Sequence, residues 1–85
     1  LIGKKPPDEF IDLITKIALS IEGVESLHKI ELHDYASVKK VSLHIQVDEK
    51  LNINKAHHIS SLVKAKIWDE CKAYAIVHIE PNIEK

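Results

Sequence analysis

The chain has 85 residues, of which 45% are hydrophobic and 29% are charged, and its formal net charge is -1 at pH 7. A chain this short buries only about two thirds of the surface that it exposes when unfolded, so it suits one small domain with a single core. All 12 basic residues are Lys, and a near-neutral charge without the planar fork of Arg argues against nucleic-acid binding and phosphoryl-transfer chemistry.

The start of the chain predicts a fragment of a longer protein. The chain contains no Met and begins with Leu1, Ile2 and Gly3, which are followed by Lys4 and Lys5. Such a start remains when a chain is cut just past a membrane helix with a basic cytoplasmic flank, although a cloning scar would leave a similar one. The apolar runs of the chain itself fall far short of the ~20 residues that span a bilayer.

A first helix is predicted to begin at Pro6, Pro7 and Asp8, because Pro is tolerated in the first turn and acidic groups favour the positive end of the helix dipole. Gly23 is predicted to stop this helix. Apolar residues recur between them at helical spacing, namely Phe10, Leu13, Ile14, Ile17, Ala18 and Ile21.

Two strands joined by a hairpin are predicted next. The first runs from Val24 to about His33, and regular alternation would place His28, Ile30 and Leu32 on one face. Residues 34–37 read as the turn. In the second strand the apolar residues Val41, Leu43, Ile45 and Val47 alternate strictly with the polar residues Ser42, His44, Gln46 and Asp48.

A second helix and a third strand complete the pattern. Asn52 is a suitable N-cap, Trp68 lies near the helix end, and Trp68 and Phe10 are expected in the core. The inward stripe of the helix is predicted to be Ile53, Ala56, Ile59, Ser60, Val63 and Ile67. Pro81 is expected to end a strand in which Ala75, Val77 and Ile79 alternate with Tyr74, Ile76, His78 and Glu80.

The order of these elements predicts an α+β fold, an αββαβ open-faced sandwich of ferredoxin-like type with two helices on one face of a three-stranded sheet. The other sheet face is left over. It carries Tyr74 and Ile76 beside polar groups, so it is a natural surface for a ligand or partner, and a twofold dimer is the usual solution.

The histidines are the candidate metal ligands, since the chain has six of them and imidazole with carboxylate suits Zn²⁺ and similar ions. His78 and Glu80 stand two apart on a strand and therefore share a face, and His44 lies on the polar face of the neighbouring strand. Three ligands are thus expected to converge. The alternative reading is that the imidazoles are solvated or hydrogen-bonded surface groups.

His28 and His57 are further candidates if they reach the same end of the sheet. Strict alternation puts His28 in the apolar phase, so it reaches the metal face only if the strand bends or bulges at its start. His33 and His58 are expected to be surface residues that bind nothing. The lone Cys71 is expected to act as a small hydrophobe rather than a nucleophile.

Four segments in series resemble the C-terminal domain of cation diffusion facilitators, over about residues 8–81. That resemblance implies a cytosolic, metallochaperone-like domain that is not an enzyme and forms a twofold dimer. It also implies a six-helix membrane domain of the same transporter, which exchanges Zn²⁺ or a related ion for protons. The segments are Gly23-Val24-Glu25-Ser26-Leu27-His28, Leu43-His44-Ile45-Gln46-Val47-Asp48, Leu51-Asn52-Ile53-Asn54-Lys55-Ala56-His57 and Val77-His78-Ile79-Glu80-Pro81.

Carried over residue by residue, the resemblance places the regulatory metal ligands on His28, His44, His57, His78 and Glu80, near the dimer contact. The expected ion is Zn²⁺, or another divalent ion such as Fe²⁺, Mn²⁺, Co²⁺ or Cd²⁺. Residues 1–7 would be the linker from the membrane domain and residues 8–85 the metal-binding dimerisation domain, on the cytoplasmic side of the cell membrane. The sequence departs from the family pattern after His28, where it has Lys29-Ile30-Glu31, and in a hairpin without Gly.

Two other functions fit the same pattern. In the first, the domain is a dimerisation module whose histidines are incidental, and the face with Tyr74 and Ile76 is buried without metal. In the second, it is a regulatory domain that binds a small molecule such as an amino acid, although it lacks a glycine-bearing ligand loop.

Overall fold

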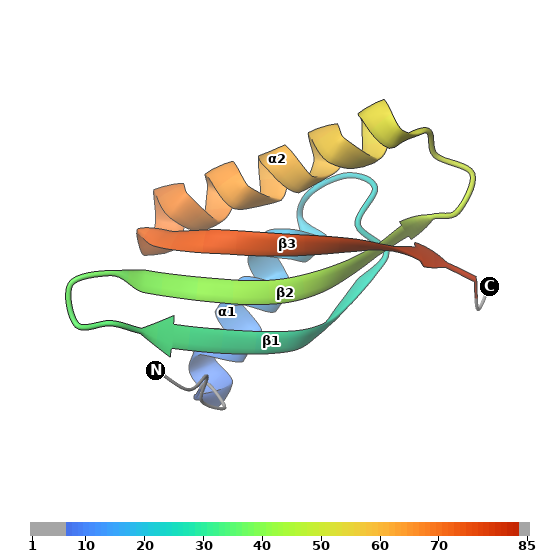
Figure 1. Cartoon of the computed structure of the whole chain (residues 1–85). Helices are drawn as coiled ribbons and strands as arrows, with labels where there is room; N and C mark the ends of the chain where they lie inside the picture. The colour runs from blue at the N-terminus through green and yellow to red at the C-terminus, as the bar shows by residue number, and fades with distance from the viewer. Residues whose placement is uncertain (1–6, 84–85) are drawn as a thin grey trace.

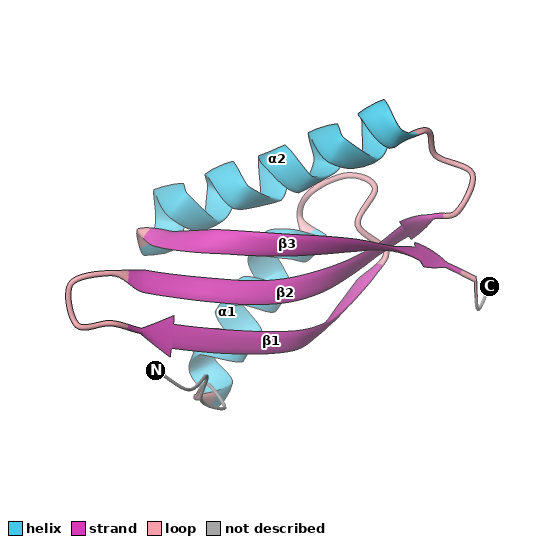
Figure 2. Cartoon of the chain, in the orientation of Figure 1, coloured by secondary structure: helices cyan, strands magenta, loops and turns pink. Residues whose placement is uncertain are grey.

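The computed structural model describes residues 7–83, so the predicted linker and the helix start at Pro6 fall largely outside the described residues. Both helices lie on one side of a three-stranded sheet whose other side is open (Figures 1 and 2). No helix in residues 7–83 is long and apolar enough to cross a membrane. The elements are α1 (Asp8–Leu19), β1 (Ser26–Asp34), β2 (Lys39–Asp48), α2 (Ile53–Cys71) and β3 (Ala73–Asn82).

The sheet has the order β1-β2-β3, with β1 antiparallel and β3 parallel to the central strand β2. The predicted αββαβ open-faced sandwich is therefore confirmed. The parallel pairing follows from the connection, because α2 returns the chain across the sheet before β3 begins.

The core lies between the sheet and the helices. Strict alternation along β2 turns one set of side chains toward the helices and leaves the polar set on the open face. The buried apolar side chains come from all the layers, and they include Ile14, Ile17 and Ala18 from α1, Val41, Leu43, Ile45 and Val47 from β2, and Ile59, Val63 and Ile67 from α2.

The helix ends have local explanations. The side chain of Asn52 accepts a hydrogen bond from the Lys55 backbone N–H at 2.8 Å, which confirms the predicted N-cap of α2. At the other end, Lys72 adopts a left-handed φ of 52° and its N–H donates to the Trp68 carbonyl. The predicted stop of α1 at Gly23 is wrong, because the helix ends at Leu19 and the Ser20 hydroxyl donates to the Ile17 carbonyl.

Gly23 lies in the turn after α1, with a φ of +101° that favours glycine. A Cβ added there would lie 2.5 Å from Cδ1 of Ile59. We expect Gly23→Ala to destabilise the domain by about 1–3 kcal/mol, measured by urea denaturation, because the backbone is strained and Ile59 must move. Glu22→Ala, at the exposed neighbouring position, is the control and should cost little. Equal stability of both variants would contradict this account.

Three residues lie elsewhere than predicted. Ile53, the first residue of α2, is 86% exposed and does not belong to the inward stripe. Trp68 is 39% exposed and packs against Tyr74 with the ring centroids 4.8 Å apart, so it is not a core residue, whereas Phe10 packs against the core. Pro81 does not end β3, since it remains paired with Val47 on an edge strand that tolerates Pro.

Candidate metal centre

Three imidazoles lie in a row across the open face of the sheet. His44, in the middle of β2, is the register partner of His28 on β1 and of His78 on β3. The rings stack, with the centroid of His44 5.4 Å from that of His28 and 4.5 Å from that of His78. Pairing of the three strands therefore brings together three imidazoles, although His28 and His78 are 50 residues apart in the chain.

A β-bulge brings His28 to this face. The pairing of β1 with β2 runs regularly to His28 and then shifts, so that Lys29 and Ile30 together stand opposite Leu43. Lys29 has a φ of 52°. The prediction that His28 shares a face with Ile30 is therefore wrong. The strand has the bulge that the sequence pattern required for His28 to reach the metal face.

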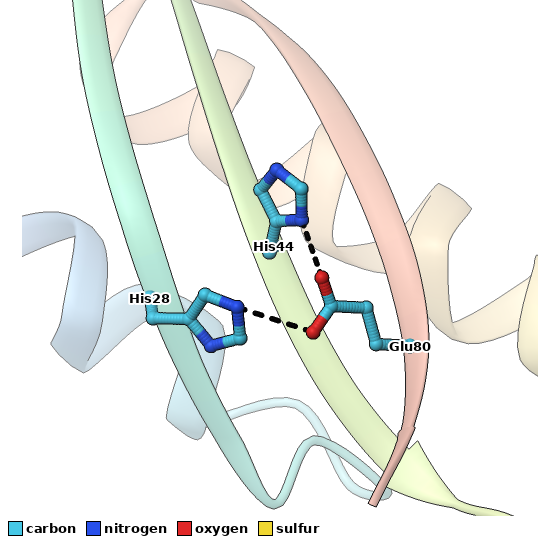
Figure 3. A group of neighbouring side chains, drawn as sticks. All are labelled: His28, His44 and Glu80. Carbon is cyan, nitrogen blue, oxygen red and sulfur yellow. Dashed lines mark hydrogen bonds and ion pairs between the residues drawn. The ribbon is translucent and has the colours of Figure 1, made fainter.

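Glu80 joins two of the three imidazoles. Nδ1 of His44 donates to Oε2 at 2.6 Å, and Nε2 of His28 lies 3.1 Å from Oε1 (Figure 3). The hydrogen bond from His44 lowers the pKa of the Glu80 carboxyl, burial opposes this, and electrostatic interactions with His28, His44 and Lys29 lower the pKa further. The carboxylate thus stays ionised and points both oxygens at imidazole nitrogens.

The donor atoms of His28, His44 and Glu80 all lie within 4.8 Å of one another. Two donors bound to one tetrahedral Zn²⁺ at about 2.0–2.1 Å are about 3.3 Å apart, so small rotations of the rings would bring the three atoms to ligand distance. The side chains are 38%, 24% and 32% exposed, which leaves an ion access to water for its remaining position. This group fits a divalent ion with nitrogen and oxygen ligands.

The other two expected ligands stand apart from this group. His78 is exposed and stacks on His44, next to the three donors but outside their set. His57 is exposed in the first turns of α2, in the layer on the other side of the sheet. A single copy of residues 7–83 thus brings together three of the five expected ligands.

The remaining reactive side chains lie outside the group of three donors, and His33, expected at the surface, is half-buried. Burial raises the pKa of the Cys71 thiol, and Glu70 raises it further against the effect of Lys39, so a low-pKa nucleophile is disfavoured. His33 is half-buried beside Tyr35, and His58 is exposed on the helical side. An open pocket of about 660 Å³ lies near His58 and holds none of the five expected ligands, its lining being Glu22, Gly23, Leu51, Asn54, Lys55, His58, Ile59 and Leu62.

Sequence reasoning missed two polar neighbours of the centre. Gln46 is the register partner of Glu80, and its side-chain oxygen accepts a hydrogen bond from the Ser26 hydroxyl. Both belong to the open face, one step along the sheet from His44 and His28. The strict alternation of β2 could have pointed to Gln46, because it shares the polar phase of His44.

Comparison with known proteins identifies relatives of the chain. Residues 6–82 match the sequence profile of the family described as the cation efflux protein, cytoplasmic domain. An uncharacterised transporter of Methanocaldococcus jannaschii is 32% identical over 81 residues, which are 94% of this chain and 29% of the transporter. The chain therefore spans less than a third of the length of that relative.

Solved structures share the fold. A point variant of the MamM CTD has a TM-score of 0.82 at 16% identity, covering 91% of this chain and 99% of that one. Another MamM CTD variant, in a nickel form, has a TM-score of 0.82 at 17% identity, covering 89% and 99%. CzrB, named as a candidate zinc transporter, has a TM-score of 0.81 at 15% identity, covering 92% and 99%. Likeness at such low identity establishes the common fold.

Proposed function

The chain belongs to the cation efflux family, as its cytoplasmic domain, and from this premise we propose that it regulates the transporter by binding a divalent metal ion within a homodimer. The observation that carries the proposal is the cluster of His28, His44 and Glu80, whose donor atoms lie within 4.8 Å of one another. Two imidazoles and a carboxylate suit Zn²⁺ best, and Fe²⁺, Mn²⁺, Co²⁺ or Cd²⁺ are the other candidates.

His78 and His57 complete the proposed ligand set. His78 stacks on His44 and so lies next to the three donors, and we expect its side chain to turn toward the ion. His57 lies in the helical layer and reaches the open face only where a second copy brings its own α2 against it. We therefore assign His57 to a site shared across the dimer contact, below a membrane domain that exchanges metal for protons. Residues 1–7 would link that domain to the described fold.

Regulation follows from differential binding. An ion placed between His28, His44 and Glu80 neutralises the carboxylate and offsets the cost of packing a second copy against the open face. It shifts the protomers toward a compact dimer only to the extent that it binds that form better. Abundant cytosolic metal would in this way raise transport by the full protein.

A second candidate is a dimerisation module that needs no metal. It is favoured by Tyr74 and Ile76, which are 56% and 50% exposed on the open face beside the histidines. Apolar side chains of this size on one sheet face are commonly covered by a partner. In this case the imidazole row would be incidental to dimer formation.

A Zn²⁺ titration of the purified domain tests the proposal, with one ion per protomer expected at neutral pH. Both ligand nitrogens bind the ion only without a proton, so affinity should fall by roughly 10–100-fold between pH 6.5 and 5.5. Glu80 does not contribute to this loss, because its pKa is held below the ordinary 4.5.

The control is the same titration of His44→Ala, where one imidazole fewer should reduce the fall in affinity to roughly 3–10-fold over the same pH interval. Binding of less than one ion per protomer by the unaltered domain at micromolar Zn²⁺ and neutral pH would contradict the sensor function. Calorimetry at both pH values provides the measurement.

A further inference from the structure

The bulge in β1 allows apolar residues of this strand to face the core while His28 faces the open side of the sheet. A regular strand could not place both in this way. Leu27, Ile30 and Leu32 all pack against the core side or pair with residues that do, while His28 pairs with His44 on the open face. In a regular strand Ile30 and Leu32 share the phase of His28, so either His28 would enter the core or the leucine and isoleucine would leave it.

We propose that the bulge formed by Lys29 and Ile30 is the device that assigns His28 to the metal face, with Lys29 as its positioning residue. The inference deepens the proposed function, because His28 matters as a ligand only if the domain binds metal. The placement of His28 by the bulge is independent of any ion.

The backbone supports this role. One residue is extra between the pairs His28–His44 and Glu31–Ser42, and Lys29, with its φ of 52°, absorbs it. A left-handed φ is readily adopted by glycine and disfavoured for residues with a Cβ, most of all the β-branched ones. Strain of this kind persists where the surroundings impose it, and here it lies directly beside a site residue.

Deletion of Lys29 tests whether one extra residue in β1 is the cause of the bulge. The shortened strand would pair regularly, with Ile30 opposite Leu43, and would keep His28 opposite His44 without any bulge. Lys29→Gly should keep the bulge at lower strain. Lys29→Val should disfavour it and let the start of β1 slip by one residue, which turns His28 away from the open face.

The ammonium group of Lys29 also acts on Glu80, so charge must be separated from backbone. Lys29→Gly, Lys29→Val and the deletion all remove the same charge, and differences among them report the backbone alone. Lys39→Val is the matched control, because it makes the same chemical change at an exposed, regularly paired position of β2.

Two readouts keep this inference apart from the proposed function. Cross-strand nuclear Overhauser contacts between the backbones of residues 28 and 44, without metal, report the register. Co²⁺ absorption titrations report binding. We expect the contacts in the parent, the Gly variant, the deletion and Lys39→Val, with Co²⁺ affinities of the Gly variant and the deletion within about 3-fold of each other and that of Lys29→Val at least about 10-fold lower.

The outcomes are distinct. Persistence of the His28–His44 contact in Lys29→Val, with Co²⁺ affinity equal to that of the Gly variant, overturns the inference. If Lys29→Val does not fold, the deletion decides: a retained contact supports the bulge as register device, and a lost contact overturns it. If the contacts follow the expected order but not even the parent binds Co²⁺, the proposed function fails while the placement of His28 stands.

Discussion

Glu80→Gln is expected to lower the affinity of the domain for Zn²⁺ by more than about 100-fold. Glu80 is the residue that contacts both His44 and His28, and the substitution keeps its shape while removing the charge and one ligand oxygen. Losing a residue that merely supports a ligand already costs about 10–100-fold in metal affinity, so losing a ligand should cost more. Competition with a chelator of known affinity measures the change.

The control for this substitution is Glu31→Gln, which alters the same functional group on the same face of the sheet, opposite Ser42 and away from the three donors. It should leave Zn²⁺ affinity nearly unchanged. Equal affinities of the two variants would show that the ion binds elsewhere.

The double variant His44→Ala and His78→Ala distinguishes the metal sensor from the dimerisation module that needs no metal. An unaltered dimer affinity in sedimentation, with an unaltered response to metal, would favour the metal-independent module.

The fold was predictable because the spacing of apolar and polar residues within each element determines which side of that element is buried. The alternation of β2 alone fixes a buried face and a polar face, and the Asn52 cap and helical spacing of apolar residues define α2. The errors lie at the ends of elements, where one residue decides between competing geometries. Ile53 fits the helical period but is exposed at the first residue of α2, and Gly23 lies in the turn after α1 rather than closing the helix.

The site was predictable in part, for a physical reason. Parity along one strand placed His78 and Glu80 on one face, and strict alternation placed His44 on the polar face, without knowledge of the partner strands. The face of His28 depends on a bulge, which arises from pairing between β1 and β2 and shows in the sequence only as a spacing of three between the core-side residues Leu27 and Ile30. Lys at the left-handed position, where Gly would have been a signal, concealed it.

Leu43→Ala is expected to destabilise the domain by about 2–5 kcal/mol, a large part of the roughly 5–15 kcal/mol that holds a typical domain together. Leu43 is fully buried at the centre of β2, between the residues of the bulge and the helices, so its loss leaves a cavity that the sheet cannot close. Urea denaturation without metal measures the cost. Ile53→Ala removes a side chain of equal size that is 86% exposed and should change stability by less than about 0.5 kcal/mol.

Zn²⁺ should restore stability to the Leu43→Ala variant, because metal binding on the open face stabilises the same sheet that the core supports. Leu43 and His44 are neighbours on opposite faces of β2, so an ion that binds only the folded sheet stabilises it by about 2.7 kcal/mol when its concentration is 100 times the dissociation constant. Leu43→Ala is therefore expected to regain about that much stability in Zn²⁺, whereas the combined variant Leu43→Ala and Glu80→Gln should regain little. Equal rescue of both would mean that the stabilising ion does not use Glu80.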